Sequence, residues 1–168
     1  MWFRNLTLFR FSENTAKSLK SLETKLAKHR LRPCGPIELA THGFISPLGR
    51  DEEALTHRIG DFVLLNVANE SRLLPNSVVS DELSARLKKI SDKEHRKVGA
   101  KERKRLKDEV LTDLLPRAFT KMSRTSCYLS LKSGWMVLDT PSRKTAEEAV
   151  SHLREALGTF PAVPMAPE

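Results

Sequence analysis

The chain has 168 residues, of which 39% are hydrophobic and 30% charged, and its formal net charge at pH 7 is +8. This length accommodates one domain with an ordinary apolar core, and the composition excludes a wholly disordered chain. The longest apolar run, "FVLL" at 62–65, is far too short for a membrane span, and the N-terminus lacks the form of a secretory signal. We therefore expect a cytoplasmic protein.

The first third of the chain predicts a strand, a helix and three further strands. Aromatic and β-compatible residues favour a strand within 2–11. A helix over 12–29 follows, capped by Ser12 or Asn14, because its apolar residues recur every three or four positions. That stripe consists of Ala16, Leu19, Leu22 and Leu26. The later strands are expected near 41–46, 54–59 and 62–68, with Gly60-Asp61 as a tight turn between the last two.

The middle of the chain predicts two helices with a strongly basic stretch between them. A helical stripe begins near Asn76 or Ser77, disappears from Ser91 to Arg105, and resumes at Leu106 until Pro116. Its apolar members are Val79, Leu83, Leu87, Ile90, Leu106, Val110, Leu111, Leu114 and Leu115. The simplest interpretation is an antiparallel helical hairpin joined near 98–100. One long helix broken at Gly99 is the alternative.

The last third predicts a strand over 125–132, a turn at Ser133-Gly134, a strand over 135–140 and a helix over 145–158. The buried stripe of that helix is Ala146, Ala149, Val150, Leu153 and Leu157. Gly158 supplies its C-terminal stop, and the proline-rich end is extended. The whole pattern predicts an α+β fold: an antiparallel β-sheet with packed helices and a protruding basic helical hairpin. The expected domains are a body, 1–75 and 120–168, with an inserted arm, 76–119.

The net positive charge is confined to one segment of the chain. Residues 86–107 contain eleven Lys or Arg and three acidic residues, so this segment alone carries +8, and the rest of the chain is balanced. Like charges at helical spacing repel by a few tenths of a kcal/mol per pair. A basic surface of this kind gains affinity for duplex DNA by displacing its counterions, without reading any base. No Asn or Gln lies in 86–107, which argues against base-edge recognition. The candidate DNA-binding residues are Arg86, Lys88, Lys89, Lys93, Arg96, Lys97, Lys101, Arg103, Lys104, Arg105 and Lys107.

A protein-interaction module is the alternative function. The basic arm would then steer association with an acidic partner protein, such as a host recombination or defence protein. Phe119 or Trp135 would anchor that contact.

No catalytic or cofactor motif accompanies the basic segment. The chain has no Gly-x-x-x-x-Gly-Lys-Ser/Thr, Gly-x-Gly-x-x-Gly or Gly-x-Ser-x-Gly sequence, and its five histidines share no metal-ligand spacing. Cys34 and Cys127 belong to no Cys-x-x-Cys pair, so we expect reduced thiols. Asp51, Glu52 and Glu53 are consecutive and are expected in a solvated loop. We expect no enzyme, no metal and no cofactor.

Several motifs resemble one bacterial family in order and spacing. The stretch "LKDEVLTDLLPRAF" at 106–119 is similar to the RdgC family of recombination-associated proteins. Matching pieces along the chain are "MWFRNL" at 1–6, "PCG" at 33–35, "DEEALTH" at 51–57, "LLP" at 73–75 and "AEEAVSHLREALGTFPAVP" at 146–164. The resemblance covers about the N-terminal half of the family's length.

The resemblance implies an α+β protein that dimerises into a ring around duplex DNA, with a positive inner face and no sequence preference. It implies a protein of the nucleoid that restrains RecA filaments and has no enzymatic activity. Within "LLPRAF", it makes Leu115, Arg117 and Phe119 candidates for a contact between subunits, although Phe119 packed beside Leu115 in the local core is an equal alternative. A chain ending at Glu168 is expected to form an open clamp, or no dimer.

Overall fold

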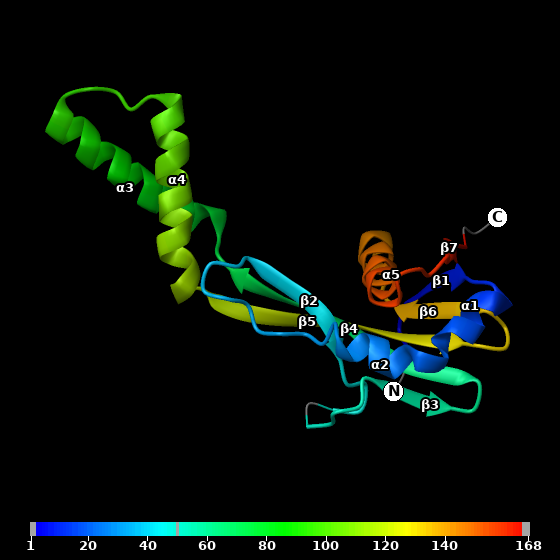
Figure 1. Ribbon diagram of the computed structural model, residues 1–168. Helices are drawn as coiled ribbons and strands as arrows, with labels where there is room; N and C mark the ends of the chain where they lie inside the picture. Colours follow the sequence, from blue (N-terminus) through cyan, green and yellow to red (C-terminus); the bar gives the residue numbers. More distant parts are fainter. Residues whose placement is uncertain (1–2, 50, 166–168) are drawn as a thin grey trace. The chain divides into compact units, whose positions relative to one another are not determined.

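The computed structural model describes residues 3–49 and 51–165, which form seven strands, five α-helices and two short 3₁₀ helices (Figure 1). In chain order, the elements are β1 (Leu6–Arg10), α1 (Glu13–Ser18), η1 (Leu19–Ser21), α2 (Leu22–Ala27), β2 (Ala40–Ile45), β3 (Thr56–Ile59), β4 (Phe62–Leu73), α3 (Asn76–Glu94), α4 (Ala100–Leu114), η2 (Leu115–Arg117), β5 (Phe119–Ser130), β6 (Trp135–Asp139), α5 (Arg143–Leu157) and β7 (Val163–Pro164). No helix within these residues is both long and apolar enough to cross a membrane.

The chain divides into two compact units. The sheet unit comprises Met1–Arg32, His42–Asn69 and Met122–Glu168, and the hairpin unit comprises Pro33–Thr41 and Glu70–Lys121. Strands β2, β4 and β5 contribute residues to both units. Most of the predicted arm, 76–119, is helical and lies within the hairpin unit.

The strands form one sheet in the order β2-β4-β5-β6-β1-β7, with β3 paired to β4. The pairs β1–β6, β1–β7, β3–β4 and β5–β6 are antiparallel. Together with the helices, this sheet confirms the predicted α+β fold. The predicted turns at both hairpins are present, and each glycine adopts a positive φ that other residues rarely adopt: 57° at Gly60 and 69° at Gly134.

Apolar side chains from the sheet and from three helices form the core of the sheet unit. Helix α5 begins at its N-cap Ser142, whose hydroxyl accepts a hydrogen bond from the Thr145 amide at 3.2 Å, and ends at Gly158. All five residues of its predicted stripe are buried. On the earlier helical segment, Leu19, Leu22 and Leu26 are buried, as their spacing predicts.

The helix predicted over 12–29 is interrupted. The 3₁₀ helix η1 separates α1 from α2, and Ser12 caps the first of them, accepting from the Thr15 amide at 3.4 Å. The short 3₁₀ helix winds more tightly than an α-helix but leaves the leucines on the buried side. Hydrophobic spacing alone therefore does not reveal the break.

Two strands are longer than the sequence predicts, β4 at its C-terminal end and β5 at its N-terminal end. Strand β4 runs to Leu73 rather than 68, and β5 begins at Phe119 rather than 125. The added residues of β5, 119–124, are all exposed, so their sequence has no alternation of apolar and polar positions to indicate a strand.

The hairpin unit contains the predicted pair of helices. Helices α3 and α4 pack together and are joined by the loop 95–99, which excludes the single broken helix. Their buried residues are Val79, Leu83, Leu106 and Val110, all members of the predicted stripe. The left-handed residue of the turn is His95, with φ 49°, whereas Gly99 is extended and precedes α4.

Both cysteines are free thiols, as expected. Cys127 is buried in β5, and this burial raises the pKa of its thiol. Cys34 is half-buried and its Sγ lies 3.2 Å from the carbonyl oxygen of Glu70.

Candidate nucleic-acid interface

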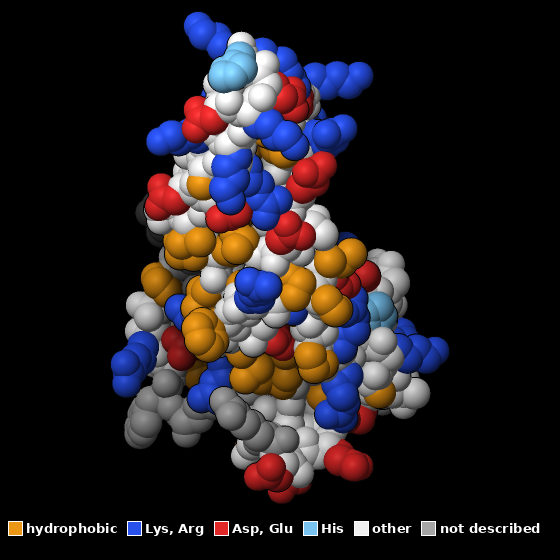
Figure 2. Space-filling model, turned by 90° about the vertical axis from the view of Figure 1, so that its left-hand side faces the viewer, with side chains coloured by type: hydrophobic (Ala, Val, Ile, Leu, Met, Phe, Trp, Pro, Cys, Tyr) orange, Lys and Arg blue, Asp and Glu red, His pale blue; other side chains and the backbone are white. Residues whose placement is uncertain are grey.

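Lys and Arg side chains project from several sides of the helical hairpin (Figure 2). Ten of the eleven candidate DNA-binding residues are exposed, and Arg86 is half-buried. Helices α3 and α4 pack together with Val79, Leu83, Leu106 and Val110 buried, and the cations occupy the remaining faces of both helices.

Three of the eleven cations form ion pairs with neighbouring carboxylates. Arg86 bonds Glu82 at 3.0 Å and Asp113 at 2.8 Å, Arg96 bonds Glu94 and Glu102, and Arg105 lies 3.3 Å from Glu109. Their positive charge is partly neutralised within the hairpin itself.

The other eight cations have no carboxylate within 4.0 Å among the residues that the structure describes. They are Lys88, Lys89, Lys93, Lys97, Lys101, Arg103, Lys104 and Lys107. Seven of the eight are lysines, which act as mobile point charges rather than as rigid bidentate donors. We call these eight residues the free cations. They can meet phosphate groups without first breaking an ion pair.

The turn of the hairpin is closed by charge-assisted hydrogen bonds. The guanidinium of Arg96 donates to both carboxylate oxygens of Glu102, at 2.7 and 2.9 Å, and to Glu94 at 2.6 Å. The bonds to Arg96 lower the pKa of the Glu102 carboxyl, and the bonds to Glu102 and Glu94 raise the pKa of Arg96. The geometry is bidentate, which is the strongest form of this pair.

Arg86 connects the two helices instead of projecting from them. Its side chain donates to Glu82 one turn earlier in α3 and to Asp113 in α4. The hydrogen bonds to Asp113, and then to Glu82, raise the pKa of Arg86. This arrangement suits a structural role within the hairpin better than contact with a ligand.

The segment that follows α4 differs sharply in exposure from one residue to the next. Phe119 is 84% exposed, and Leu115 is only 6% exposed. The side chain of Arg72 fixes the segment between them, donating to the carbonyl oxygens of Leu115 at 2.7 Å and Ala118 at 3.1 Å. Arg117 is exposed. Phe119 therefore does not pack in the local core, and the buried Leu115 is not available to a partner.

Other large apolar side chains of the hairpin unit are also exposed. They are Ile37, Leu39, Leu73 and Val78, with exposed fractions between 44 and 67%. The backbone amide of Arg72, the residue before Leu73, donates to the carbonyl of Leu39 at 2.8 Å. Leu39 and Leu73 therefore lie on neighbouring stretches of backbone.

Trp135, the other candidate anchor for a partner, belongs to the sheet unit and is half-buried. The guanidinium of Arg10 lies over the Trp135 ring, 4.7 Å from the ring centre.

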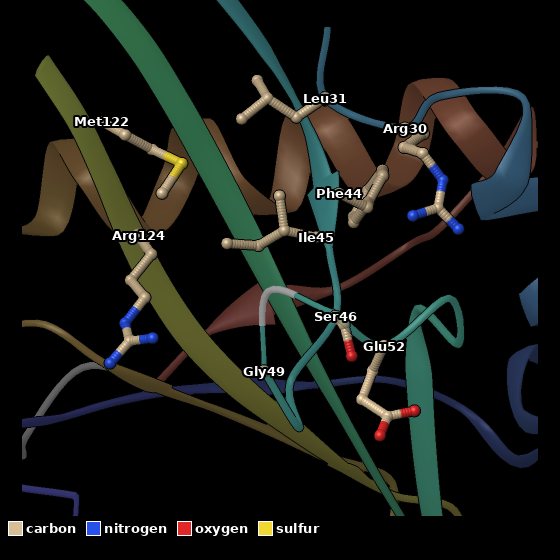
Figure 3. A pocket seen from close by; sticks show the side chains of 9 residues that line it. All are labelled: Arg30, Leu31, Phe44, Ile45, Ser46, Gly49, Glu52, Met122 and Arg124. Atoms are coloured by element: carbon tan, nitrogen blue, oxygen red, sulfur yellow. The ribbon is translucent and has the colours of Figure 1, made fainter.

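A pocket of about 520 Å³ in the sheet unit has a mixed lining of apolar and charged side chains, and its charged groups do not converge (Figure 3). It is lined by Arg30, Leu31, Phe44, Ile45, Ser46, Gly49, Glu52, Met122 and Arg124. Figure 3 shows the guanidinium groups of Arg30 and Arg124 on opposite sides of this pocket. Arg30 already donates to the carbonyl of Glu53. This arrangement does not form an anion site.

Sequence reasoning missed one cluster of chemically active side chains. His42, His152 and Glu155 have donor atoms that all lie within 4.8 Å of one another. His42 is 110 positions before His152, so no spacing could have connected them. The only local signal was His152-x-x-Glu155, which places two side chains on one face of a helix. Asp51, Glu52 and Glu53 are exposed in a loop, as predicted.

The chain matches a protein-family model along its whole length. That model, described as "Putative exonuclease, RdgC", matches residues 1–168. Curated relatives named recombination-associated protein RdgC are 49% identical in Xanthomonas campestris and 48% identical in Xanthomonas axonopodis and Xylella fastidiosa, in each case over 98% of this chain. The chain spans about half of their length, 54%. The resemblance found in the sequence motifs is confirmed, and the chain belongs to the RdgC family.

Proposed function

We propose that this chain binds duplex DNA through phosphate groups, without sequence preference, by means of its helical hairpin. The observation that carries the proposal is the set of eight free cations on the hairpin, against a chain that is otherwise electrically balanced. The names of the relatives, which associate them with recombination, agree with a ligand of this class.

The physical basis is the exchange of small counterions for protein charges. Duplex DNA carries one negative charge per roughly 1.7 Å of its axis and condenses cations along its length. Helix α3 alone has 19 residues and is therefore about 28 Å long, comparable to eight base pairs of duplex. Several free cations can thus reach phosphates at once, and each released counterion favours binding.

The composition of the hairpin favours binding that is independent of sequence. Direct readout of bases relies on rigid bidentate donors, such as Arg on guanine or Asn and Gln on adenine. Of the three arginines in ion pairs, Arg96 has its guanidinium engaged on both of its edges. The free cations are almost all lysines, which position a protein on the backbone without selecting a sequence.

We further propose that the chain self-associates through Phe119 and Arg117 and, on DNA, acts as a dimeric clamp. A phenylalanine exposed at the start of β5, directly after a carbonyl that Arg72 holds, is suited to a contact between subunits. A clamp that occupies the duplex would obstruct extension of a RecA-type filament, which is the role in recombination that we propose.

We propose no catalytic step, although the family model carries an exonuclease description. Phosphodiester hydrolysis commonly relies on carboxylates that hold magnesium beside the scissile bond. Among the residues that the structure describes, the basic surface of the hairpin contains no group of His, Cys, Asp or Glu able to hold a metal ion. Duplex incubated with the protein and Mg²⁺ or Mn²⁺ should therefore remain intact on a denaturing gel.

A pair of charge-matched variants tests the DNA-binding proposal. The hairpin variant replaces Lys88, Lys101, Lys104 and Lys107 with Gln, and the control replaces Lys28, Lys132, Arg143 and Lys144 of the sheet unit with Gln. All eight residues are exposed, and each variant loses four positive charges. Fluorescence anisotropy with a duplex of random sequence should show a loss of affinity of more than about tenfold for the hairpin variant and little change for the control.

Equal losses of affinity in both variants would show that the net charge of the protein, rather than the position of the lysines on the hairpin, determines binding. That result would contradict the proposal. If wild-type protein shows no duplex binding near physiological salt but forms a stable complex with an acidic protein, the interaction-module alternative replaces it.

A further inference from the structure

Two elements of the sheet unit bring His42, His152 and Glu155 together. His42 lies on β2, while His152 and Glu155 are three positions apart on α5 and share one helix face. The imidazole rings of His42 and His152 are stacked, with centres 3.7 Å apart and planes inclined by 18°. Nε2 of His42 is 3.5 Å from Oε2 of Glu155.

The spacing of these donor atoms suits a single small cation. Bonds of about 2.0–2.2 Å in tetrahedral geometry place neighbouring ligand atoms about 3.3–3.6 Å apart. The separation between His42 and Glu155 already has this value, and all three donors are within 4.8 Å. About half of the His42 side chain and 60% of the Glu155 side chain are exposed, so both can rotate. Because the two rings are now stacked, rotation of His42 out of the stack is needed to direct both imidazoles at one ion.

The backbone holds both sides of the cluster in place. Residues 29–31 lie directly against β2, with hydrogen bonds between Leu31 and Phe44 at 3.0 Å and between Phe44 and His29 at 2.9 Å. A Cβ atom on Gly43 would lie 2.5 Å from the Leu31 nitrogen, so only glycine allows this approach. On the other side, Leu153 is fully buried and anchors the turn of α5 that carries His152 and Glu155. The two halves of the cluster are therefore fixed by packing that does not depend on a metal.

The electrostatic surroundings favour a cation. Glu148 lies one turn before His152 on α5, so this helix face presents two carboxylates beside the imidazoles.

We propose that His42, His152 and Glu155 form a binding site for one divalent transition-metal ion of the zinc class. Two imidazoles and one carboxylate select zinc, cobalt or nickel over calcium and magnesium, which require oxygen ligands. Three protein ligands leave at least one coordination position open to solvent. The ion would connect β2 to α5 and stabilise the sheet unit by its binding free energy.

Cobalt serves as a spectroscopic probe for this site. Tag-free protein, treated with EDTA and dialysed, is titrated with Co²⁺ while its visible absorption is recorded, and Zn²⁺ is then added to displace the cobalt. Wild-type protein should bind one Co²⁺ per chain with d–d bands typical of four or five ligands. His42→Gln and His152→Gln should each weaken binding by about tenfold or more. The controls His57→Gln and Cys34→Ser, which alter residues outside the cluster, should bind like wild type.

Nuclear magnetic resonance provides a measurement that needs no variant. Addition of Zn²⁺ should shift the imidazole resonances of His42 and His152 and leave those of His57 and His95 unchanged. A stacked histidine pair with no metal function would give no saturable Co²⁺ binding below about 1 mM. That result, or binding that both glutamine variants retain, would overturn the proposal.

Discussion

Arg96 and Glu102 join the turn of the helical hairpin to the first turn of α4 through two parallel hydrogen bonds of 2.7 and 2.9 Å. The pair determines which cations of the hairpin are available. Arg96 lies among the most basic residues of the chain, yet its guanidinium is held by its own neighbours. The accessible positive charge therefore belongs mainly to the lysines around it.

Glu102→Gln should strengthen DNA binding. The substitution removes a negative charge and weakens the hold on Nη1 and Nη2 of Arg96, while the bond from its Nε to Glu94 remains. These two nitrogens can then approach a phosphate, so the plot of log affinity against log salt should steepen by up to about 0.9. Hydrogen exchange at 95–99 should also accelerate, because the turn loses its bidentate bond. Glu147→Gln, which removes an exposed carboxylate of α5, is the control in both assays. Weaker binding by Glu102→Gln would show that the closed turn itself is needed for contact.

Arg86→Gln and Lys88→Gln should affect different properties: the first should change the stability of the hairpin, and the second should change DNA binding. Arg86 connects α3 to α4 through Asp113, so its loss should lower the thermal stability of the hairpin but leave the salt dependence of DNA binding unchanged. Lys88 is exposed and has no carboxylate partner among the described residues, so its loss should flatten the salt dependence and leave stability unchanged. Thermal melts and anisotropy titrations of both variants provide the comparison. A reversed pattern would make Arg86 a DNA contact.

Asp139 should contribute to stability above pH 4 and lose that contribution in acid. Its Oδ1 accepts hydrogen bonds from the backbone amides of Asn5 at 3.0 Å and Arg4 at 2.9 Å, and these bonds lower the pKa of its carboxyl. A lowered folded-state pKa gives stability that is complete above the unfolded value, about 3.9, and disappears as pH falls through the folded value. Asp139→Asn should therefore have a lower Tm than wild type at pH 6, and the difference should shrink toward pH 2.5. Asp51→Asn, in an exposed loop, serves as the control; a constant difference across this range would contradict the assignment.

Phe119→Asp should abolish self-association without unfolding the chain. Because 84% of this side chain is exposed, its replacement removes little packing within the subunit. Leu115→Ala, at a buried position in the same segment, should instead destabilise the protein by about 2–5 kcal/mol. Sedimentation with and without a 30-base-pair duplex reports the oligomeric state. Ile59→Asp, which alters another highly exposed residue, is the matched control. A Phe119→Asp variant that still forms wild-type assemblies would exclude Phe119 from the interface.

The fold was largely predictable where hydrophobic spacing reflects burial. The α5 stripe is buried as expected, and so are Val79, Leu83, Leu106 and Val110 of the hairpin stripes, because amphipathic helices need little information from distant residues. The hairpin residues Leu87, Ile90, Leu111 and Leu114 are only half-buried. The same argument could not find η1, since a local change to 3₁₀ geometry leaves the leucines buried. Nor could it find the start of β5, because the exposed residues 119–124 have no hydrophobic pattern.

The candidate sites were predictable only in part, for a related reason. The distribution of charge along the sequence locates the basic hairpin, but it cannot distinguish among the eleven cations. The structure shows that Arg86, Arg96 and Arg105 form ion pairs with carboxylates, unlike the others. The contact of His42 with His152 depends on how β2 and α5 pack, and nothing in the local sequence of either element specifies it.

The salt dependence of duplex binding tests the central claim most directly. With about five phosphates neutralised, the slope of log affinity against log salt for wild-type protein should be about −4.5. The Lys88, Lys101, Lys104 and Lys107→Gln variant keeps at most four of these contacts, so its slope should be no steeper than about −3.6. Both slopes are measured between about 50 and 200 mM salt, a range over which several phosphate contacts change the affinity by orders of magnitude. Such a difference would show that the free cations of the hairpin are the phosphate contacts. Equal slopes in the two proteins would contradict that account.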